Sequence, residues 1–295
     1  MKVLDIMMNY FEIEPEQNTF KTLSIQTTYQ CQMACQNCYL GNMLNNPQYE
    51  NIDIVLFKNV LSRLPNRTDI RFIGAEPTMN PQLFDLLKLT RKLGHRPSLL
   101  TNGLKLRKED YVIGLKKAGL RLLGLSMNGG LEDQVYLEFD NGKYAKQKIA
   151  ALDNCFKHNI LPHINVIIDP TNIHIIEPLV NHIVEVSLKY NRKINPITYP
   201  VMLRLKSIGK IGNYRDTYTY SLKEMMNLFP IKYSNYIDGY EEKRSVIGEW
   251  NGLLIKLTDW TLDDDGVPDS NSDRRGILTN DGKIAPFFEF YCKED

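Results

Sequence analysis

The chain has 295 residues, of which 43% are hydrophobic, and this is enough for a large core in one barrel-like domain or in a domain with an appendage. Its 36 basic and 35 acidic residues give a formal net charge of +1 at pH 7. This balance argues against a strong overall electrostatic attraction of nucleic acid, although a local basic patch is still possible. The sequence has no run of about 18 apolar residues that would span a membrane and no signal-peptide core near its start, so we expect a cytoplasmic protein without a membrane partner.

The N-terminal part of the chain contains a group of closely spaced cysteines. Residues 1–20 are mixed and polar, and we expect an N-terminal extension there. Residues 21–27 alternate apolar with polar side chains, which is typical of a strand. Just after this strand, Cys31, Cys35 and Cys38 follow one another with the spacing C-x3-C-x2-C.

Three thiolates on one short loop can hold three irons of a 4Fe–4S cluster and leave the fourth iron without a protein ligand. A structural zinc site is the alternative, but such sites usually pair C-x2-C with a second Cys/His pair. The other cysteines, Cys155 and Cys292, are isolated, and no histidine shows paired ligand spacing beside a cysteine. Five cysteines are also too few and odd in number for a disulfide framework. The pattern therefore favours an iron–sulfur cluster over zinc.

The following residues alternate between helix-like and strand-like patterns. Helical spacing of apolar residues occurs in segments 52–64, 81–93, 107–118, 144–158 and 173–190. Strand-like segments lie between them, at 69–73, 97–100, 121–127, 163–169 and 194–205. Asn80 is expected to cap the second helix, and Gly119 to close the third. With the first strand, these segments form six strand–helix units, which predict an α/β fold: a partial (β/α)6 barrel of parallel strands.

Polar or glycine-bearing segments follow the carboxyl ends of the predicted strands. In parallel sheets the active site lies at these ends. The segments are the cysteine loop, Gly74-Ala75-Glu76-Pro77, Thr101-Asn102-Gly103, Ser126-Met127-Asn128-Gly129 and Asp169-Pro170-Thr171-Asn172. We therefore expect them to meet at one rim of the barrel.

Residues 20–205 resemble the radical S-adenosylmethionine (radical SAM) superfamily. The cysteine motif followed by Tyr39 is similar to the cluster motif of that superfamily. Gly74-Ala75-Glu76-Pro77 resembles its G-G-E-P motif, with alanine in place of the second glycine, and alanine still allows a close backbone approach. Residues 126–129 resemble its ribose-contacting strand end.

The resemblance implies two cofactors, a 4Fe–4S cluster held by Cys31, Cys35 and Cys38, and S-adenosylmethionine chelated to the open iron. One electron from the reduced cluster would cleave S-adenosylmethionine to methionine and a 5′-deoxyadenosyl radical. That radical would remove a hydrogen atom from a substrate carbon, with an electron donor such as flavodoxin or ferredoxin as partner. The cofactors carry this chemistry, and the protein supplies placement and exclusion of water.

The resemblance also implies residues that contact S-adenosylmethionine. They are Tyr39, Gly74, Ala75, Glu76, Thr101, Asn102, Ser126, Asn128 and Ile168. Tyr39 would lie beside the adenine, and residues 74–76 would face the methionyl ammonium. Ser126 and Asn128 would bond the ribose or the methionyl carboxylate, although Asn-Gly is also a turn signal. Thr101 and Asn102 would support the rim or cap a helix, and Ile168, with Ile167, would cover the adenine or belong to the core.

Residues 206–295 carry no family motif, and we expect a C-terminal α+β extension that covers the barrel mouth and contributes to the substrate site. A helix over 221–229, a strand over 252–257 and a hairpin over 276–288 are predicted. The aspartate-rich segment 260–273 fails as a calcium loop, because Arg274 stands where glutamate is required. The basic residues of 203–215 could hold a phosphate or carboxylate of a substrate, or belong to a solvated loop.

One of the remaining two cysteines could act after hydrogen abstraction, as a catalytic residue that completes the reaction. Cys155 and Cys292 are too few for another full cysteine-ligated cluster, and either could donate a hydrogen atom to a product radical. The position of Cys155 inside a predicted helix favours a buried structural thiol instead.

Three functions follow from these patterns. The first is a radical enzyme acting on a C–H bond of a peptide or small metabolite. The second is a radical enzyme that modifies a nucleotide or RNA, which the near-neutral charge disfavours. The third is a non-catalytic zinc-binding or protein-interaction module on an α/β scaffold.

Overall fold

The computed structural model describes residues 11–36, 38–194, 200–208, 219–233, 245–260 and 275–287. Its strands are β1 (Thr22–Gln26), β2 (Asp69–Ile73), β3 (Arg96–Thr101), β4 (Leu122–Ser126), β5 (Pro162–Ile167), β6 (Met202–Ile208), β7 (Lys232–Tyr233), β8 (Ser245–Trp250), β9 (Leu253–Trp260), β10 (Arg275–Leu278) and β11 (Ile284–Pro286). Its α-helices are α2 (Ile54–Arg63), α3 (Leu83–Lys92), α4 (Glu109–Lys117), α5 (Asp133–Asp140), α6 (Ala145–Lys157), α7 (Ile176–Lys189) and α8 (Leu222–Leu228). Short 3-10 helices are η1 (Pro15–Gln17), η2 (Gly41–Met43), η3 (Pro77–Met79), η4 (Leu104–Arg107) and η5 (Ile173–Ile175).

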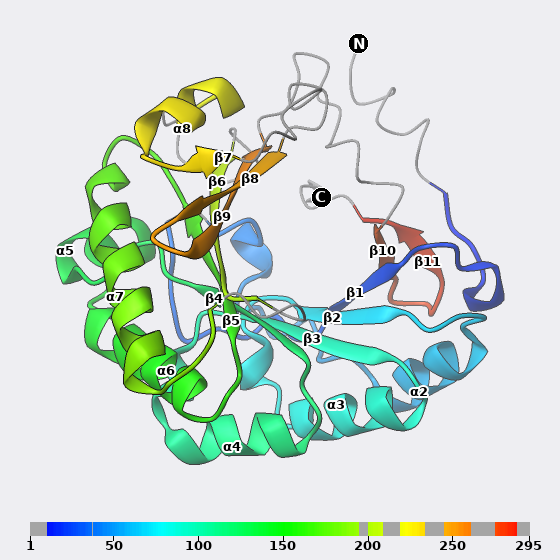
Figure 1. Ribbon diagram of the computed structural model, residues 1–295. Helices are drawn as coiled ribbons and strands as arrows, with labels where there is room; N and C mark the ends of the chain where they lie inside the picture. Colours follow the sequence, from blue (N-terminus) through cyan, green and yellow to red (C-terminus); the bar gives the residue numbers. More distant parts are fainter. Residues whose placement is uncertain are drawn as a thin grey trace, which may run out of the picture.

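The described strands form a single curved sheet with helices on its outer face (Figure 1). The strand order is β11-β10-β1-β2-β3-β4-β5-β6-β9-β8-β7. Strands β1 to β6 are parallel neighbours in chain order, which confirms the predicted partial barrel. Helices α2, α3, α4, α6 and α7 cover the outside, as crossover connections between parallel strands require.

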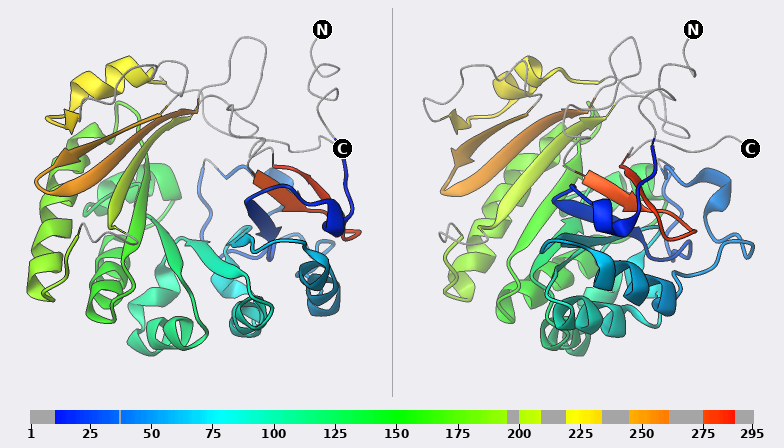
Figure 2. Two further views of the ribbon diagram at one scale, coloured as in Figure 1. Left: turned by 45° about the vertical axis from the view of Figure 1, so that its right-hand side comes forward. Right: turned by 90° about the vertical axis from the view of Figure 1, so that its right-hand side faces the viewer.

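The C-terminal residues extend this sheet at both edges. Strand β10 pairs in parallel with β1, and β9 pairs in parallel with β6. The antiparallel strands β11 and β8 lie outside them. Figure 2 shows the C-terminal strands at opposite edges of the curved sheet, with β10 and β11 at one edge and β7 to β9 at the other.

Several boundaries differ from the predicted ones. Helix α3 begins at Leu83 with Gln82 as its N-cap, so Asn80 does not cap it. Asn80 instead accepts a hydrogen bond from the backbone of Gln82 at 2.8 Å and donates one to the carbonyl of Thr27 at 2.9 Å. The segment 107–118 is divided between η4 and α4, and helix α5 was not expected from the sequence.

The two faces of each parallel strand differ in chemistry because side chains alternate along a strand. On β6, Leu203 and Leu205 are fully buried against the helical layer, whereas Arg204 and Lys206 line the inside of the barrel. The predicted hairpin of 276–288 is confirmed as the β10–β11 pair. Among the described residues, no helix has both the length and the apolar character needed to cross a membrane.

We predict that the C-terminal strands are an integral part of the core. Ile255 on β9 is fully buried, and Ile255→Ala should lower the free energy of unfolding by about 2–5 kcal/mol, as for other large-to-small core substitutions. Ile247 on the neighbouring strand β8 is 46% exposed, and Ile247→Ala is the matched control, with an expected effect within about 0.5 kcal/mol. Urea denaturation measures both, and equal losses would contradict the integral packing of β9.

Candidate functional site

A pocket of about 1080 Å³ lies inside the barrel and is lined by residues from the loops and inner strand faces. The residues predicted from the sequence meet there. They are Cys31, Cys35, Cys38, Tyr39, Gly74, Ala75, Glu76, Thr101, Asn102, Ser126 and Asn128. Four of the five expected segments thus converge on this pocket, whereas none of residues 169–172 is among its lining, and Asn172 contacts the rim through the carbonyl of Asn128.

The cysteine loop rests directly on the turn after β2. The backbone N–H of Ala75 donates to the carbonyl of Thr28 at 3.0 Å, and that of Glu76 donates to Gln30 at 3.1 Å. Gly74 has a φ of +130°, and a Cβ at this position would lie 2.6 Å from the carbonyl oxygen of Thr28. Glycine is therefore needed at residue 74 for the close approach of the two loops.

Asn45 holds the first cysteine in place. Its Oδ1 accepts from the backbone N–H of Cys31 at 2.8 Å, and its Nδ2 donates to the carbonyl of Cys31 at 3.1 Å. Its own backbone N–H donates to Tyr29 at 2.8 Å, and its φ of 57° is one that asparagine tolerates. Sequence reasoning missed this residue, because no local pattern marks it.

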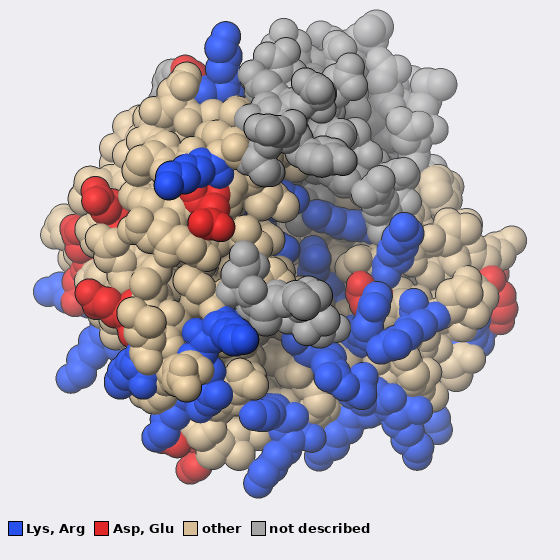
Figure 3. Space-filling model, viewed as in Figure 1, with Lys and Arg blue, Asp and Glu red and all other residues tan. Residues whose placement is uncertain are grey.

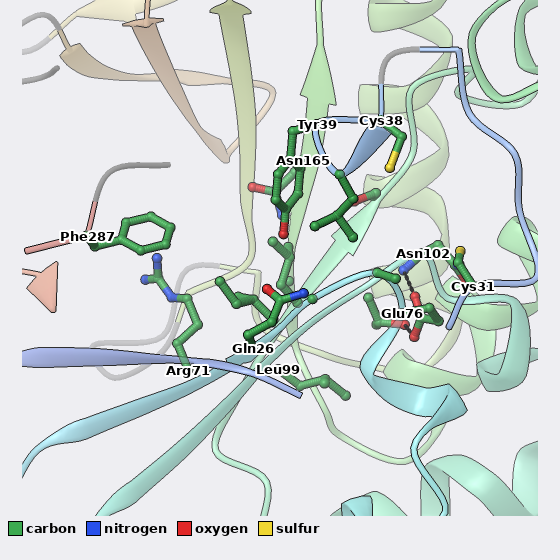
Figure 4. A pocket seen from close by; sticks show the side chains of 18 of the residues that line it. Gln26, Cys31, Cys38, Tyr39, Arg71, Glu76, Leu99, Asn102, Asn165 and Phe287 are labelled. Atoms are coloured by element: carbon green, nitrogen blue, oxygen red, sulfur yellow. Dashed lines mark hydrogen bonds between the residues drawn. The ribbon is translucent and has the colours of Figure 1, made fainter. Parts of the chain in front are cut away.

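The buried carboxylate of Glu76 connects the ends of β2 and β3. Oε1 accepts from the hydroxyls of Thr78 and Thr101, each at 2.6 Å, and from the backbone of Thr78 at 3.0 Å. Oε2 accepts from the backbone N–H of Asn102 at 2.7 Å, a contact visible in Figure 4. The Nδ2 of Asn102 lies 3.7 Å from the sulfur of Cys31. Glu76 therefore fixes the loop that contacts the first cysteine.

A second buried charge lies behind the cysteine loop. Lys148 on α6 is fully buried, and its Nζ donates to the carbonyl of Ser126 at 2.8 Å and lies 3.9 Å from Oδ2 of Asp140. Asp140 also raises the pKa of Cys35, an effect second to that of burial. Lys148 and Asp140 both line the pocket. No sequence pattern singles them out, since they come from α6 and from the unexpected helix α5.

Asn128 connects the ends of β4 and β5. Its Oδ1 accepts from the backbone N–H of Ile167 at 3.1 Å, and its Nδ2 lies 3.4 Å from Oδ1 of Asp140. Its carbonyl accepts from Nδ2 of Asn172 at 3.0 Å. The side chain therefore has a structural role at the rim, alongside its place in the pocket lining.

Two of the predicted site residues lie in the core instead. Ile168 is 2% exposed and packs in the hydrophobic core, while its neighbour Ile167 lines the pocket, because successive side chains point to opposite faces. Cys155 is fully buried among apolar side chains on the helical side of the sheet, and burial raises its pKa to about 12. This position does not suit a hydrogen donor to a radical in the barrel. Cys292 lies outside the described residues.

The three thiols fit an iron–sulfur cluster. All three are partly buried and line the same pocket, and burial raises the pKa of each, to about 11 for Cys31. Thiolates in such a setting need a nearby positive charge, which bound metal supplies. Among the residues that the structure describes, no three Cys, His, Asp or Glu side chains converge on one metal ion. Each thiolate of a 4Fe–4S cluster binds a different iron, so such convergence is not required.

Comparisons with known proteins agree with this reading. Residues 25–183 match the family model of the radical SAM superfamily. The 7,8-dihydro-6-hydroxymethylpterin dimethyltransferase of Methanocaldococcus jannaschii is 30% identical over 139 residues, which cover 45% of this chain and 27% of that protein. The tungsten-containing aldehyde ferredoxin oxidoreductase cofactor-modifying protein of Pyrococcus furiosus is 22% identical over 292 residues, covering 92% of this chain and 71% of that protein.

The fold is also similar to solved structures of SuiB from Streptococcus suis. SuiB bound to S-adenosylmethionine has a TM-score of 0.64 at 16% identity, covering 94% of this chain and 62% of that chain. SuiB bound to the precursor peptide SuiA has a TM-score of 0.62 at 15% identity, covering 94% and 61%. The chain thus spans less than two thirds of SuiB and about a quarter of the dimethyltransferase. Since the family model matches more than half of the sequence, the chain belongs to the radical SAM superfamily, whose enzymes use a 4Fe–4S cluster and S-adenosylmethionine.

Proposed function

We propose that this chain is a radical SAM enzyme that removes a hydrogen atom from a C–H bond of a peptide or small metabolite. The observation that carries the proposal is the arrangement of three thiols and the residue 74–76 turn in one pocket at the carboxyl ends of parallel strands. When bound, the cluster supplies the electron that cleaves S-adenosylmethionine to methionine and a 5′-deoxyadenosyl radical. The electron comes from an external donor such as flavodoxin or ferredoxin, and the protein works in the cytoplasm.

In this proposal, Cys31, Cys35 and Cys38 hold three irons of the cluster. The turn at Gly74, with the backbone N–H groups of Ala75 and Glu76, keeps the cysteine loop against the end of β2, and the carboxylate of Glu76 holds the loop after β3. The negative charge of Glu76 also suits a nearby methionyl ammonium.

The other rim residues bind the remaining parts of S-adenosylmethionine. Lys148 supplies a positive charge for the methionyl carboxylate, next to the backbone of Ser126. Tyr39 and Ile167 cover the adenine from the pocket wall, and the barrel around them excludes water from the radical.

We divide the chain into an N-terminal extension at 1–20, a catalytic core at 21–205 and a C-terminal extension at 206–295. In this proposal the C-terminal extension contributes residues to the substrate site. Two pocket residues support it, Lys256 on β9 and Arg275 on β10.

The experiment that tests the function is anaerobic reconstitution with iron and sulfide, followed by reduction with dithionite and measurement of 5′-deoxyadenosine. Deuterated candidate substrates, with mass analysis of the 5′-deoxyadenosine formed, then identify the substrate and the carbon attacked. Stoichiometric zinc with no cleavage of S-adenosylmethionine would favour the metal-binding module instead.

We predict that Cys31→Ala, Cys35→Ala and Cys38→Ala each abolish the cluster. Iron should fall from about four atoms per chain to near zero, because each thiol is one of only three protein ligands. Iron analysis and the visible absorption band measure the loss. Cys155→Ala is the matched control and should keep full iron, since Cys155 lies in the core. Retention of a full cluster in any of the three loop variants would contradict the ligand assignment.

Removal of the Glu76 carboxylate should destabilise the rim. Glu76→Ala leaves the buried donors of Thr78, Thr101 and Asn102 without their acceptor, at an expected cost of about 2–4 kcal/mol in the free energy of unfolding. Urea denaturation measures this cost. Glu177→Ala, at an exposed site on α7, is the control and should change stability little. A loss no larger than that of the control would show that these hydrogen bonds do not hold the rim.

Loss of the Lys148 charge should weaken cofactor binding. Lys148→Gln is expected to reduce the affinity for S-adenosylmethionine by about tenfold, the scale of one charge-assisted hydrogen bond, with iron content retained. Isothermal titration calorimetry of the reconstituted protein measures the affinity. Lys157→Gln, on the outer side of the same helix α6, is the matched control. Unchanged affinity in a folded Lys148→Gln protein would remove Lys148 from the cofactor site.

A further inference from the structure

A group of basic side chains lines the inside of the barrel apart from the cysteine loop. Its members lie on four different strands and are all half-buried: Arg71, Arg204, Lys206, Lys256 and Arg275. Figure 4 shows Arg71 pointing into the pocket away from Cys31, Glu76 and Asn102, and Figure 3 shows Lys and Arg atoms inside the hollow of the molecule. We call these five residues the basic wall. None of them has a role in the proposed binding of the cluster or of S-adenosylmethionine.

The strand register brings like charges together in the basic wall. Arg204 on β6 is the direct register partner of Lys256 on β9, and both side chains face the pocket. Lys206 follows Arg204 on the same face, because side chains two residues apart on a strand point the same way. Like charges directly opposite one another on neighbouring strands repel each other, so this register concentrates positive charge on one part of the barrel wall.

A buried histidine indicates that the basic wall converges on one region. His163 on β5 is 8% exposed and lines the pocket, and its Nδ1 is buried without a hydrogen-bond partner. Its pKa is lowered to about 3, first by burial and then by the positive charges of Arg204, Arg71 and Lys256. Arg71 is on β2, which is three strands away from β5 in the sheet. The positive charge of Arg71 therefore acts on His163 across the inside of the barrel.

The described pocket lining holds more basic than acidic residues. The lining holds six basic residues, namely Lys148 and the basic wall, against four acidic ones, Glu12, Glu76, Asp140 and Asp281. Glu76 is bonded to the rim, and Asp140 lies beside Lys148. Glu12 and Asp281 both pair with Lys283.

The pocket is large for a single ligand. Its volume of about 1080 Å³ is slightly above the range of about 300–1,000 Å³ that is typical for one ligand. A cofactor at the cysteine end would therefore leave space at the basic wall.

We propose that the basic wall binds a phosphate group of a small-molecule substrate, with His163 as an additional hydrogen-bonding group. This inference rests on the proposed radical SAM function and names the class of its substrate. Three arginines and two lysines suit a group with more than one negative charge, and the planar guanidinium forks match phosphate oxygens. The position of the wall inside the barrel, on half-buried side chains, suits a small molecule better than a folded macromolecule.

The test uses the full chain with its cluster reconstituted and S-adenosylmethionine present, titrated with inorganic pyrophosphate in a calorimeter. Wild-type protein should bind pyrophosphate more tightly than propane-1,2,3-tricarboxylate, a tricarboxylate of similar charge. Arg204→Gln and Lys256→Gln should each weaken pyrophosphate binding by about tenfold, the scale of one charge-assisted hydrogen bond. Lys58→Gln, on the exposed face of α2, removes the same charge outside the barrel and should leave the affinity unchanged.

Circular dichroism and iron content establish that each variant is folded, and if Arg204→Gln fails to fold, Lys256→Gln decides the result. Absence of pyrophosphate binding, equal affinity in all variants, or tighter binding of the tricarboxylate would each overturn the phosphate assignment. Formation of 5′-deoxyadenosine on reduction, measured in the same samples without substrate, tests the proposed function separately. Cleavage without pyrophosphate binding overturns only this inference, whereas pyrophosphate binding without cleavage overturns the radical SAM activity.

Discussion

The rim of the barrel depends on one buried carboxylate. A charge that is 1% exposed is tolerated only when its oxygens are fully hydrogen-bonded, and Glu76 achieves this with donors from two neighbouring loops. The same residue uses its backbone N–H to hold the cysteine loop. The need to satisfy this single group therefore fixes the ends of β1, β2 and β3 relative to one another, and with them the position of Cys31.

The alternation of side chains along parallel strands separates stability from function in this fold. Residues that face the helices form the core, and those that face inward are free to be polar because they line a pocket. On β2, for example, Phe72 is fully buried against α2 and α3 residues while Arg71 lines the barrel. One strand thus supplies both a core residue and a pocket residue, and a shift of one position would exchange them.

Local patterns predicted the six strand–helix units and the positions of the cysteines, because both depend on residues close together in the chain. Which of Ile167 and Ile168 faces inward could not be predicted, since apolar residues follow one another at the end of β5; Ile168 lies in the core and Ile167 lines the pocket. Lys148, Asp140 and Asn45 could not be predicted, because their contacts come from tertiary packing. The pairing of β9 with β6 and of β10 with β1 joins strands far apart in the sequence, which no local pattern specifies.

The distribution of charge along the pocket has a consequence for how a substrate would lie in it. The cysteine end carries the carboxylates of Glu76 and Asp140, one lysine, Lys148, and three thiols, and the other end carries the five positive charges of the basic wall. A substrate with a phosphate at one end would be attracted to the basic wall and repelled from the carboxylates. Its uncharged part would then face the cysteine loop, so the charge pattern alone orients the molecule with a C–H bond toward the site of radical formation. The rigidity of the strands that carry both groups keeps this separation constant.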